Sequence, residues 1–301
     1  MASSLKERLR KLLLPSRVLR DLTAIQLNQG RILSELYASK PISRLNDCEF
    51  EVFSQFGEDG IIQRLVRHLP IKHRTFIEFG VEDFSEANCR FLMMNDNWRG
   101  YVLDGSARHV EKLRKWEQFW RYDLTARCAF VTRENVNDLL GASGFEQDLG
   151  ILSIDVDGMD YWILEAVEAV RPRVLIVEYN ALFGADRQIT VPYDAQFSSV
   201  RAHSSALYFG ASLGAIAAVA ARKGLALVAT ESSGTNAFFV REDLLGNGLD
   251  ALPVRAAYHD SFARQSRDAQ GKLDYLDRAG RMAAVRGMPV VNVETGTVEP
   301  L

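Results

Sequence analysis

The sequence predicts an α/β protein, an αβα sandwich built on a mostly parallel seven-stranded sheet that ends in an antiparallel hairpin. Two observations predict this fold. From residue 60 onward, helical stripes alternate with short runs of β-branched and aromatic residues, a pattern typical of βα units and a parallel sheet. Near residue 230, two such runs are separated by only a short turn, so the last two strands must be antiparallel.

The elements are expected in a regular order. A helical stripe of Ile61, Leu65 and Leu69 ends at Pro70, and a further helix is expected to begin at Ser106. A later helix should end at Gly224. The seven strands are expected at residues 75–80, 100–105, 128–132, 150–155, 173–178, 225–229 and 237–241. Together they predict a Rossmann-like sheet, and residues 289–293 are expected to form an edge strand.

Length and composition indicate one main core with material left at both ends. The 301 residues, 47% of them hydrophobic, are expected to divide into an N-terminal basic amphipathic segment (1–45), a main domain (46–245) and a C-terminal extension (246–301). A net charge of -3 argues against a nucleic-acid partner. Three widely spaced cysteines and the lack of a long apolar run lead us to expect a cytoplasmic protein that does not span a membrane.

The first 20 residues carry six basic side chains and one acidic one. After Pro15, apolar residues recur at helical spacing; they are Leu22, Ile25, Ile32, Leu33 and Leu36. One interpretation is a helix for peripheral membrane contact or homo-oligomer formation. The other is a helix that packs on its own domain and exposes its charges to solvent.

The ends of the first two expected strands carry acids and glycines. In a doubly wound sheet, ligands bind outside the carboxyl ends of the strands, which is where Glu78 and Gly80 lie. Glycine allows a close backbone approach, and a carboxylate can hold a positively charged amino group. Asp104 ends the second strand and can accept hydrogen bonds from both ribose hydroxyls, while Gly105 leaves room beside it.

These residues resemble a known family. The run Glu78-Phe-Gly80 followed by Asp104 resembles motif I and the acidic residue after it in class I S-adenosylmethionine-dependent methyltransferases. Residues 54–59 and 155–162 resemble the FkbM-type branch, whose members mostly O-methylate sugars and other hydroxylated natural products. The resemblance covers about residues 50–245 and implies S-adenosyl-L-methionine as cofactor, with Gln55 and Asp155 among its contacts.

The loop after Gly80 departs from the family pattern. It lacks the further glycine that many methyltransferases carry, so we expect the side chains of Ser85 and Asn88 to close it over the cofactor. The chain also has no GxGxxG run, and Glu82 and Asp83 would repel a pyrophosphate. Both features argue against a nicotinamide cofactor.

Two pairs of polar residues follow the fourth and fifth expected strands: Asp155 with Asp157, and Glu178 with Asn180. Side chains at i and i+2 of an extended segment point the same way, so the pairs should converge. Such a cluster predicts a Mg²⁺ or Mn²⁺ site, as the resemblance to catechol-type methyltransferases also implies. The alternatives are direct binding of substrate hydroxyls, or helix capping by Asp157 or Asp160.

Residues 181–205 are expected to form a long functional loop. It contains His203, our candidate for the base that removes the hydroxyl proton, with Asp155 as a second catalytic candidate. His203 could equally lie on the surface or cap the next helix. The resemblance implies an O-methyltransferase acting on a small-molecule or glycan hydroxyl. The alternatives are a methyltransferase for a non-sugar hydroxyl or amine, and a catalytically silent scaffold.

Overall fold

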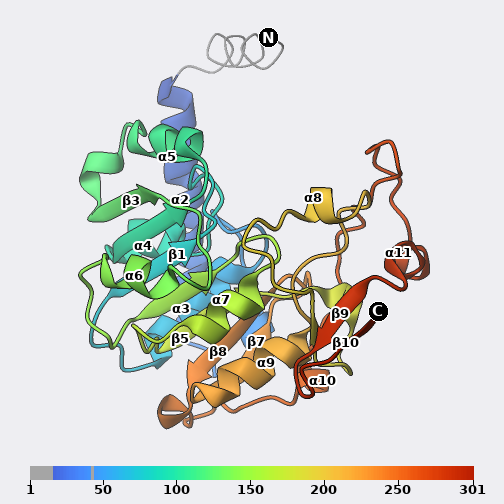
Figure 1. Ribbon diagram of the computed structural model, residues 1–301. Coiled ribbons are helices and arrows are strands. Elements are labelled where there is room, and N and C mark those ends of the chain that lie inside the picture. Colours follow the sequence, from blue (N-terminus) through green and yellow to red (C-terminus); the bar gives the residue numbers. More distant parts are fainter. Residues whose placement is uncertain (1–15, 42–43) are drawn as a thin grey trace.

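The computed structural model describes residues 16–41 and 44–301, so the basic side chains before Ser16 lie outside the described residues. A seven-stranded sheet with the order β3-β2-β1-β4-β5-β8-β7 forms the centre (Figure 1). β1 to β5 pair in parallel, and β8 is antiparallel to both β5 and β7. The predicted α/β fold and its terminal hairpin are therefore confirmed. The strands are β1 (Thr75–Phe79), β2 (Arg99–Asp104), β3 (Leu124–Cys128), β4 (Ile151–Ile154), β5 (Val174–Glu178), β7 (Leu225–Thr230) and β8 (Asn236–Arg241).

Helices cover both faces of the sheet and bury a separate apolar core on each. One core takes side chains from α6, α7 and α9, and the other takes them from α3, α4 and α5. β1 is buried at every position because both of its faces are covered, with Ile77 in the first core and Phe76 in the second. These helices are α3 (Glu58–His68), α4 (Arg90–Asp96), α5 (Ala107–Arg114), α6 (Val136–Gly141), α7 (Asp160–Ala166) and α9 (Leu213–Arg222). The expected helix signals at Ser106 and Gly224 are also confirmed: Ser106 caps α5, and Gly224 follows α9 with φ +72°.

The third strand was placed four residues too late by the sequence pattern. β3 ends at Cys128, and residues 129–132 form the loop at its carboxyl end. The Ala-Phe-Val-Thr run has the higher β propensity, but the register with β2 is set by Leu124 and Ala126, which alternate into the core. The correction moves Phe130 and Val131 from a strand to the loop at its carboxyl end, on the edge of the sheet where the other parallel strands also end.

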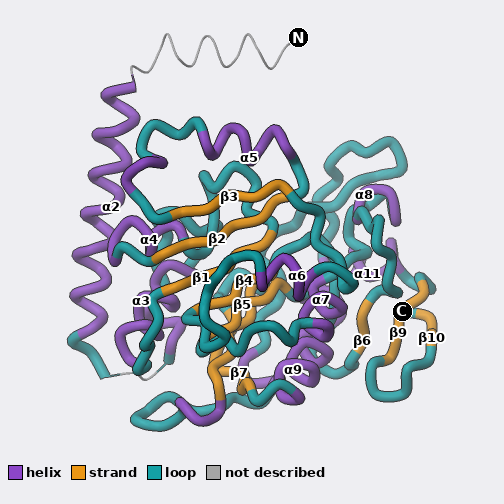
Figure 2. Tube along the Cα trace, turned by 60° about the vertical axis from the view of Figure 1, so that its left-hand side comes forward, coloured by secondary structure: helices purple, strands orange, loops and turns teal. Residues whose placement is uncertain are grey.

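The C-terminal extension forms a second sheet with part of the expected long loop. β9 (Pro289–Asn292) lies between β10 (Val298–Pro300) and β6 (Ile189–Thr190), so residues 289–293 do not form an edge strand as expected. Residues 181–205 are likewise not structureless, because they also contain η3 (Ala181–Phe183) and α8 (Ser199–Ala202). Figure 2 shows this sheet apart from the central one, on the side of the molecule opposite α2. The remaining elements are η1 (Leu45–Cys48), η2 (Phe119–Arg121), η4 (Glu242–Leu244), α10 (Val254–Ala257) and α11 (Arg278–Val285).

Helix α2 (Ser16–Ala38) packs against α3 and α4 through one face only. On that face Ser34 donates a 2.9 Å hydrogen bond to Gln63, and Gly30 packs so closely on the Phe91 ring that a Cβ would lie 2.5 Å from it. The other face exposes an apolar stripe, which comprises Val18, Leu22, Ile25, Ile32 and Leu36. No helix among residues 16–41 and 44–301 is long and apolar enough to cross a bilayer.

Candidate active site

The site is centred where the loops after β1 and β4 touch. Gly80 has φ +73°, and a Cβ on it would lie 1.6 Å from the Asp155 carbonyl oxygen. Only glycine satisfies both the left-handed backbone and this contact. The close approach predicted for Gly80 is therefore made to the neighbouring backbone, and it fixes the two strand ends relative to each other.

A first cavity of about 380 Å³ opens from this junction toward the ends of β2 and β3. It is lined by Asp104 and Gly105, as predicted, and also by His109, Phe130 and Val131. Phe130 is more than half exposed, an unusual position for a large apolar ring. Sequence reasoning missed Phe130 and Val131 because it placed them within a strand. His109 was missed because a histidine on an amphipathic helix carries no local signal.

Asp104 is held rigidly at the floor of this first cavity. Its Oδ2 accepts a 2.8 Å hydrogen bond from the Glu82 N–H, its Oδ1 accepts one of 2.7 Å from Ser106 N–H, and His109 Nδ1 lies 3.3 Å from Oδ1. Each carboxylate oxygen has a second lone pair, so the group can still accept from a ligand hydroxyl. The backbone contacts fix the direction in which these lone pairs point.

A second cavity of about 490 Å³ extends the other way, toward the ends of β4, β5 and β8. It shares Gly80, Glu82, Asp155 and Asp157 with the first, so the two cavities meet at the loop junction. The second cavity is also lined by three further predicted contact residues and two predicted metal ligands: Gln55, Glu78, Asn88, Glu178 and Asn180. The structure thus brings together most of the residues that the sequence singled out.

Glu78 lies almost fully buried beneath the junction. Its two carboxylate oxygens accept backbone hydrogen bonds from Asn88 (2.7 Å) and Cys89 (3.1 Å), while the Asn88 amide donates to Ser153. Burial outweighs these hydrogen bonds and raises the pKa of Glu78 to about 7. A cation placed beside Glu78 would therefore offset a large desolvation cost.

The loop before α3 is also held by a buried acid. Asp59 Oδ2 accepts hydrogen bonds from the backbone N–H groups of Val52, Phe53 and Ser54 at 2.7 to 3.0 Å. Burial raises the pKa of Asp59 to about 6 despite these bonds. The resulting turn presents Gln55 and Phe56 to the second cavity, so the 54–59 motif contributes two lining residues together with the acid that orders its loop.

Three carboxylates gather at the ends of β4 and β5. Asp155, Asp160 and Glu178 each offer an oxygen within 4.8 Å of the other two. Burial, followed by mutual repulsion, raises the pKa values of Asp155 and Glu178 well above their ordinary range, and burial raises that of Asp160 to about 7. Glu178 Oε2 is enclosed and has no hydrogen-bond partner among the described residues. This acidic trio can share protons or bind a cation.

The trio differs from the predicted set of metal ligands. Asp157 has φ +55°, so the i, i+2 rule for extended segments does not apply to it, and its exposed carboxylate stays outside the trio. Asn180 uses its amide within the fold: Nδ2 donates to Leu207 O and Phe209 O, and Oδ1 accepts from Leu182 N–H. The alternative of helix capping is also wrong, because Met159 takes the N-cap position of α7 and no side chain of the described residues caps it. The Asp160 carboxylate instead accepts hydrogen bonds from the backbone N–H groups of Val156 and Gly158 in the preceding loop.

Two predicted residues do not line either cavity. His203 lies at the end of α8, where its Nδ1 is 2.8 Å from Ser205 Oγ. Ser205 itself is a lining residue, so His203 stands one contact away from the cavity wall. Ser85 is exposed, and its backbone N–H donates to Asp83. The roles predicted for His203 and Ser85 remain predictions.

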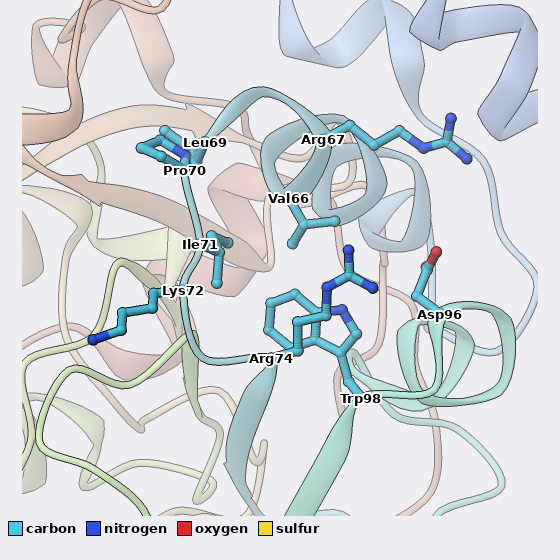
Figure 3. Close-up of a pocket in the computed structure, with 9 residues that line it drawn as sticks. All are labelled: Val66, Arg67, Leu69, Pro70, Ile71, Lys72, Arg74, Asp96 and Trp98. Atoms are coloured by element: carbon cyan, nitrogen blue, oxygen red, sulfur yellow. The ribbon is translucent and has the colours of Figure 1, made fainter.

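A third cavity, of about 590 Å³, lies at the opposite edge of the sheet (Figure 3). Its residues come from the end of α3 and the segments that precede β1 and β2, including Lys72, Arg74 and Trp98. In Figure 3 the side chains of Arg67 and Lys72 extend in opposite directions around it. It is larger than the two cavities above, but it holds no residue from a carboxyl end of a strand. The candidate active site is therefore the junction of the first two cavities.

Comparisons with known proteins give matches to solved structures alone. No protein-family model matches the chain, and no curated protein matches it. A putative O-methyltransferase from Klebsiella pneumoniae is 15% identical, over 79% of this chain and 96% of that one, with a TM-score of 0.37. An O-methyltransferase from Bacillus cereus solved with SAH is 13% identical, over 79% and 97%, with a TM-score of 0.38.

A third match is an O-methyltransferase family protein from Burkholderia thailandensis. It is 12% identical over 62% of this chain, with a TM-score of 0.38, and the match spans only 59% of the Burkholderia chain. Because identities and TM-scores are this low, these matches do not by themselves assign an activity to the chain.

Proposed function

We propose that this chain is an S-adenosylmethionine-dependent O-methyltransferase whose acceptor is a hydroxyl of a sugar or sugar-containing small molecule. The observation that carries the proposal is the pair of cavities that meet at Gly80 and Asp155. A two-part cofactor needs such a site, with one half in each cavity and its reacting centre at the junction. The sugar assignment rests on the FkbM-type resemblance of residues 54–59 and 155–162.

The residues of this chain would divide the binding work. In the first cavity, Asp104 would accept hydrogen bonds from the ribose hydroxyls through its free lone pairs, beside the Phe130 and Val131 side chains. In the second, the buried Glu78 carboxylate would hold the ammonium group. The bound cofactor supplies an electrophilic methyl group. The acceptor hydroxyl must then lie on the second-cavity side of the junction.

That hydroxyl must also lose its proton. Glu178 is a candidate for the base that accepts this proton. Its Oε2 is buried and has no hydrogen-bond partner among the described residues, and the raised pKa of the carboxyl makes its ionised form a stronger base. The acidic trio of Asp155, Asp160 and Glu178 also fits Mg²⁺ or Mn²⁺, since its donors are all oxygens and one is unpartnered. A divalent cation held there would lower the pKa of a coordinated hydroxyl.

Calorimetry with SAH tests the cofactor assignment. We expect binding by the parent protein and a roughly tenfold weaker affinity for Asp104→Asn, which loses the charge of the ribose acceptor. Asp123→Asn is the matched control, because Asp123 pairs with Arg99 on the surface at the opposite end of the sheet. Failure of the parent protein to bind SAH would support the catalytically silent scaffold. An unchanged affinity in Asp104→Asn would show that the ribose lies elsewhere.

We further propose that α2 mediates self-association. Its exposed apolar residues Val18, Leu22, Ile25, Ile32 and Leu36 follow the alternating three- and four-residue spacing of a coiled-coil seam, with Gln29 at the remaining position. A second α2 offers the same seam. The domain-facing side of the helix is already occupied, so the two contacts do not compete. The alternative partner is a membrane surface.

A further inference from the structure

The C-terminal extension supplies one wall of the second cavity. Ser261, Gln265 and Arg267 line it from an irregular segment, and Arg281 lines it from α11. Figures 1 and 2 both place α11 near α8, whose Ser199 lines the same cavity. The extension therefore covers the side of the cavity that faces away from the strand ends, where the distal part of an acceptor would lie.

Arg281 is buried without a counter-ion. Arg281 is only 5% exposed. A terminal nitrogen of its guanidinium donates one hydrogen bond, to the Ala263 carbonyl at 2.8 Å. The Nε–H is enclosed and has no acceptor, and no carboxylate among the described residues forms an ion pair with this side chain. A buried charge of this kind is costly unless an anion joins it.

Arg267 adds a second cation to the same wall. Its guanidinium donates to the Gly271 carbonyl at 2.8 Å, and within residues 16–41 and 44–301 it has no acidic partner. The adjacent Asp268 carboxylate is instead used by the backbone N–H groups of Gln270 and Lys272. Arg278, on the same helix as Arg281, is paired with Asp260 and does not line the cavity.

The two walls of the cavity therefore differ in their ionisable groups, with buried carboxyl groups on one and guanidinium groups on the other. The acidic trio lies at the strand ends, and Arg267 and Arg281 belong to the extension. An anionic group beside the trio would make ionisation of these carboxyl groups still less favourable, whereas the arginine wall would hold it, so a neutral hydroxyl is the group that fits beside the trio. Guanidinium groups are well suited to carboxylate and phosphate because their N–H donors match the spacing of the oxygens.

We infer that the methyl acceptor is an acidic sugar, bearing a carboxylate or phosphate group that Arg267 and Arg281 bind. This inference rests on the proposed methyl transfer and specifies its substrate class. The charged group would orient the acceptor so that one particular hydroxyl faces the junction. The two arginines are binding and specificity residues, because they contact the acceptor away from the reacting atoms.

The test is calorimetry on the full chain saturated with SAH, using D-glucuronate, D-glucose 6-phosphate and neutral D-glucose as probes. We expect at least one anionic probe to bind roughly tenfold or more tightly than glucose, because hydrogen bonds to charged groups are the stronger ones. The stronger of the two anions identifies carboxylate or phosphate as the natural group. Equal binding of all three probes, or no binding of either anion at tens of millimolar, would overturn the inference.

Variants localise the effect. Arg267→Gln should weaken the preferred anion by roughly tenfold and leave glucose and SAH unchanged. Arg264→Gln is the matched control, because Arg264 donates to Tyr275 and does not line the cavity. Arg281→Gln should have the larger effect. If that buried substitution prevents folding, Arg281→Lys keeps the charge and should retain the preference for anions with reduced affinity. An unchanged preference in Arg267→Gln would contradict the inference.

Cofactor binding separates the two proposals. If SAH binds and the anion preference is absent, the methyltransferase proposal stands and only the substrate class is wrong. If SAH does not bind, the proposed function is wrong. The same probes measured without SAH then still decide whether the Arg267 and Arg281 wall binds anions.

Discussion

Glu58 is a buried carboxylate whose ionisation this fold disfavours. It begins α3, is fully buried, and accepts hydrogen bonds from Phe56 N–H (2.9 Å) and from the Asn236 side chain (2.9 Å). Burial, reinforced by the nearby Glu231 carboxylate, raises the pKa of Glu58 from 4.5 to about 7. The folded state therefore binds this proton more tightly than the unfolded chain does.

The sign of the pH effect follows from that difference. Stability contributed by the protonated group is present below about pH 4.5 and is lost as the pH rises to about 7, by roughly 3 kcal/mol if Glu58 acts alone. Glu58→Gln removes the ionisation. The glutamine side chain can still accept the hydrogen bond from Phe56 N–H. If the Asn236 amide rotates, the new side-chain N–H can donate to Asn236 Oδ1, which is buried without a partner among the described residues.

We therefore expect Glu58→Gln to stabilise the ligand-free protein by about 1 to 3 kcal/mol near pH 8 and by little near pH 5. The melting temperature should rise on the order of 5 °C at the higher pH. Thermal unfolding followed by circular dichroism at a series of pH values measures this. Glu146→Gln, at an exposed position, is the control. Parallel curves for parent and variant across this pH range would refute the assignment of a raised pKa to Glu58.

The remaining predictions concern the acidic trio and α2. EDTA should abolish turnover and Mg²⁺ or Mn²⁺ should restore it. Asp155→Asn and Glu178→Gln should each remove activity, and Glu178→Gln should do so with little change in SAH affinity, because the proposed ribose and ammonium contacts lie elsewhere. If activity survives EDTA, His203→Ala becomes the test, and it should remove activity if His203 is the base. The double change of Leu22→Ser and Ile32→Ser should shift a dimer toward monomer in analytical ultracentrifugation without altering SAH affinity; a monomeric parent that binds anionic vesicles would instead indicate a membrane partner.

The strand ends could be predicted from the sequence because each carries a strong local signal. Glu78 and Gly80, Asp104 and Gly105, and the acid of β5 all follow runs that are buried on both faces, and parallel strands present their carboxyl ends at one edge. β3 gave a weaker signal, because its Leu-Thr-Ala-Arg-Cys sequence mixes small and polar residues at a sheet edge. The more β-prone residues after it lie in the loop that lines the first cavity.

The composition of the acidic trio could not be predicted, because it depends on backbone conformation outside the strands. Asp157 and Gly158 both take positive φ values, which turn the chain back so that Asp160 lies beside Asp155. Periodicity rules describe extended and helical segments and say nothing of such a turn. The arginine wall was missed for a similar reason: Arg281 lies in a polar helix, and nothing local indicates that the helix covers a cavity.

The second cavity has buried carboxyl groups on one wall and a buried arginine on the other, and both relate to the proposed reaction. Burial raises the pKa values of Glu78, Asp155 and Glu178, so the ligand-free site concentrates acids that are costly to ionise. Arg281 also carries a desolvation cost, because its positive charge is buried and no carboxylate of the described residues forms an ion pair with it. Because the two sets line opposite walls, the carboxyl groups can bind an ammonium group or a metal cation, and Arg281 can bind an anion. An acceptor that carries its anionic group away from the reacting hydroxyl would supply that anion without placing it beside the carboxyl groups.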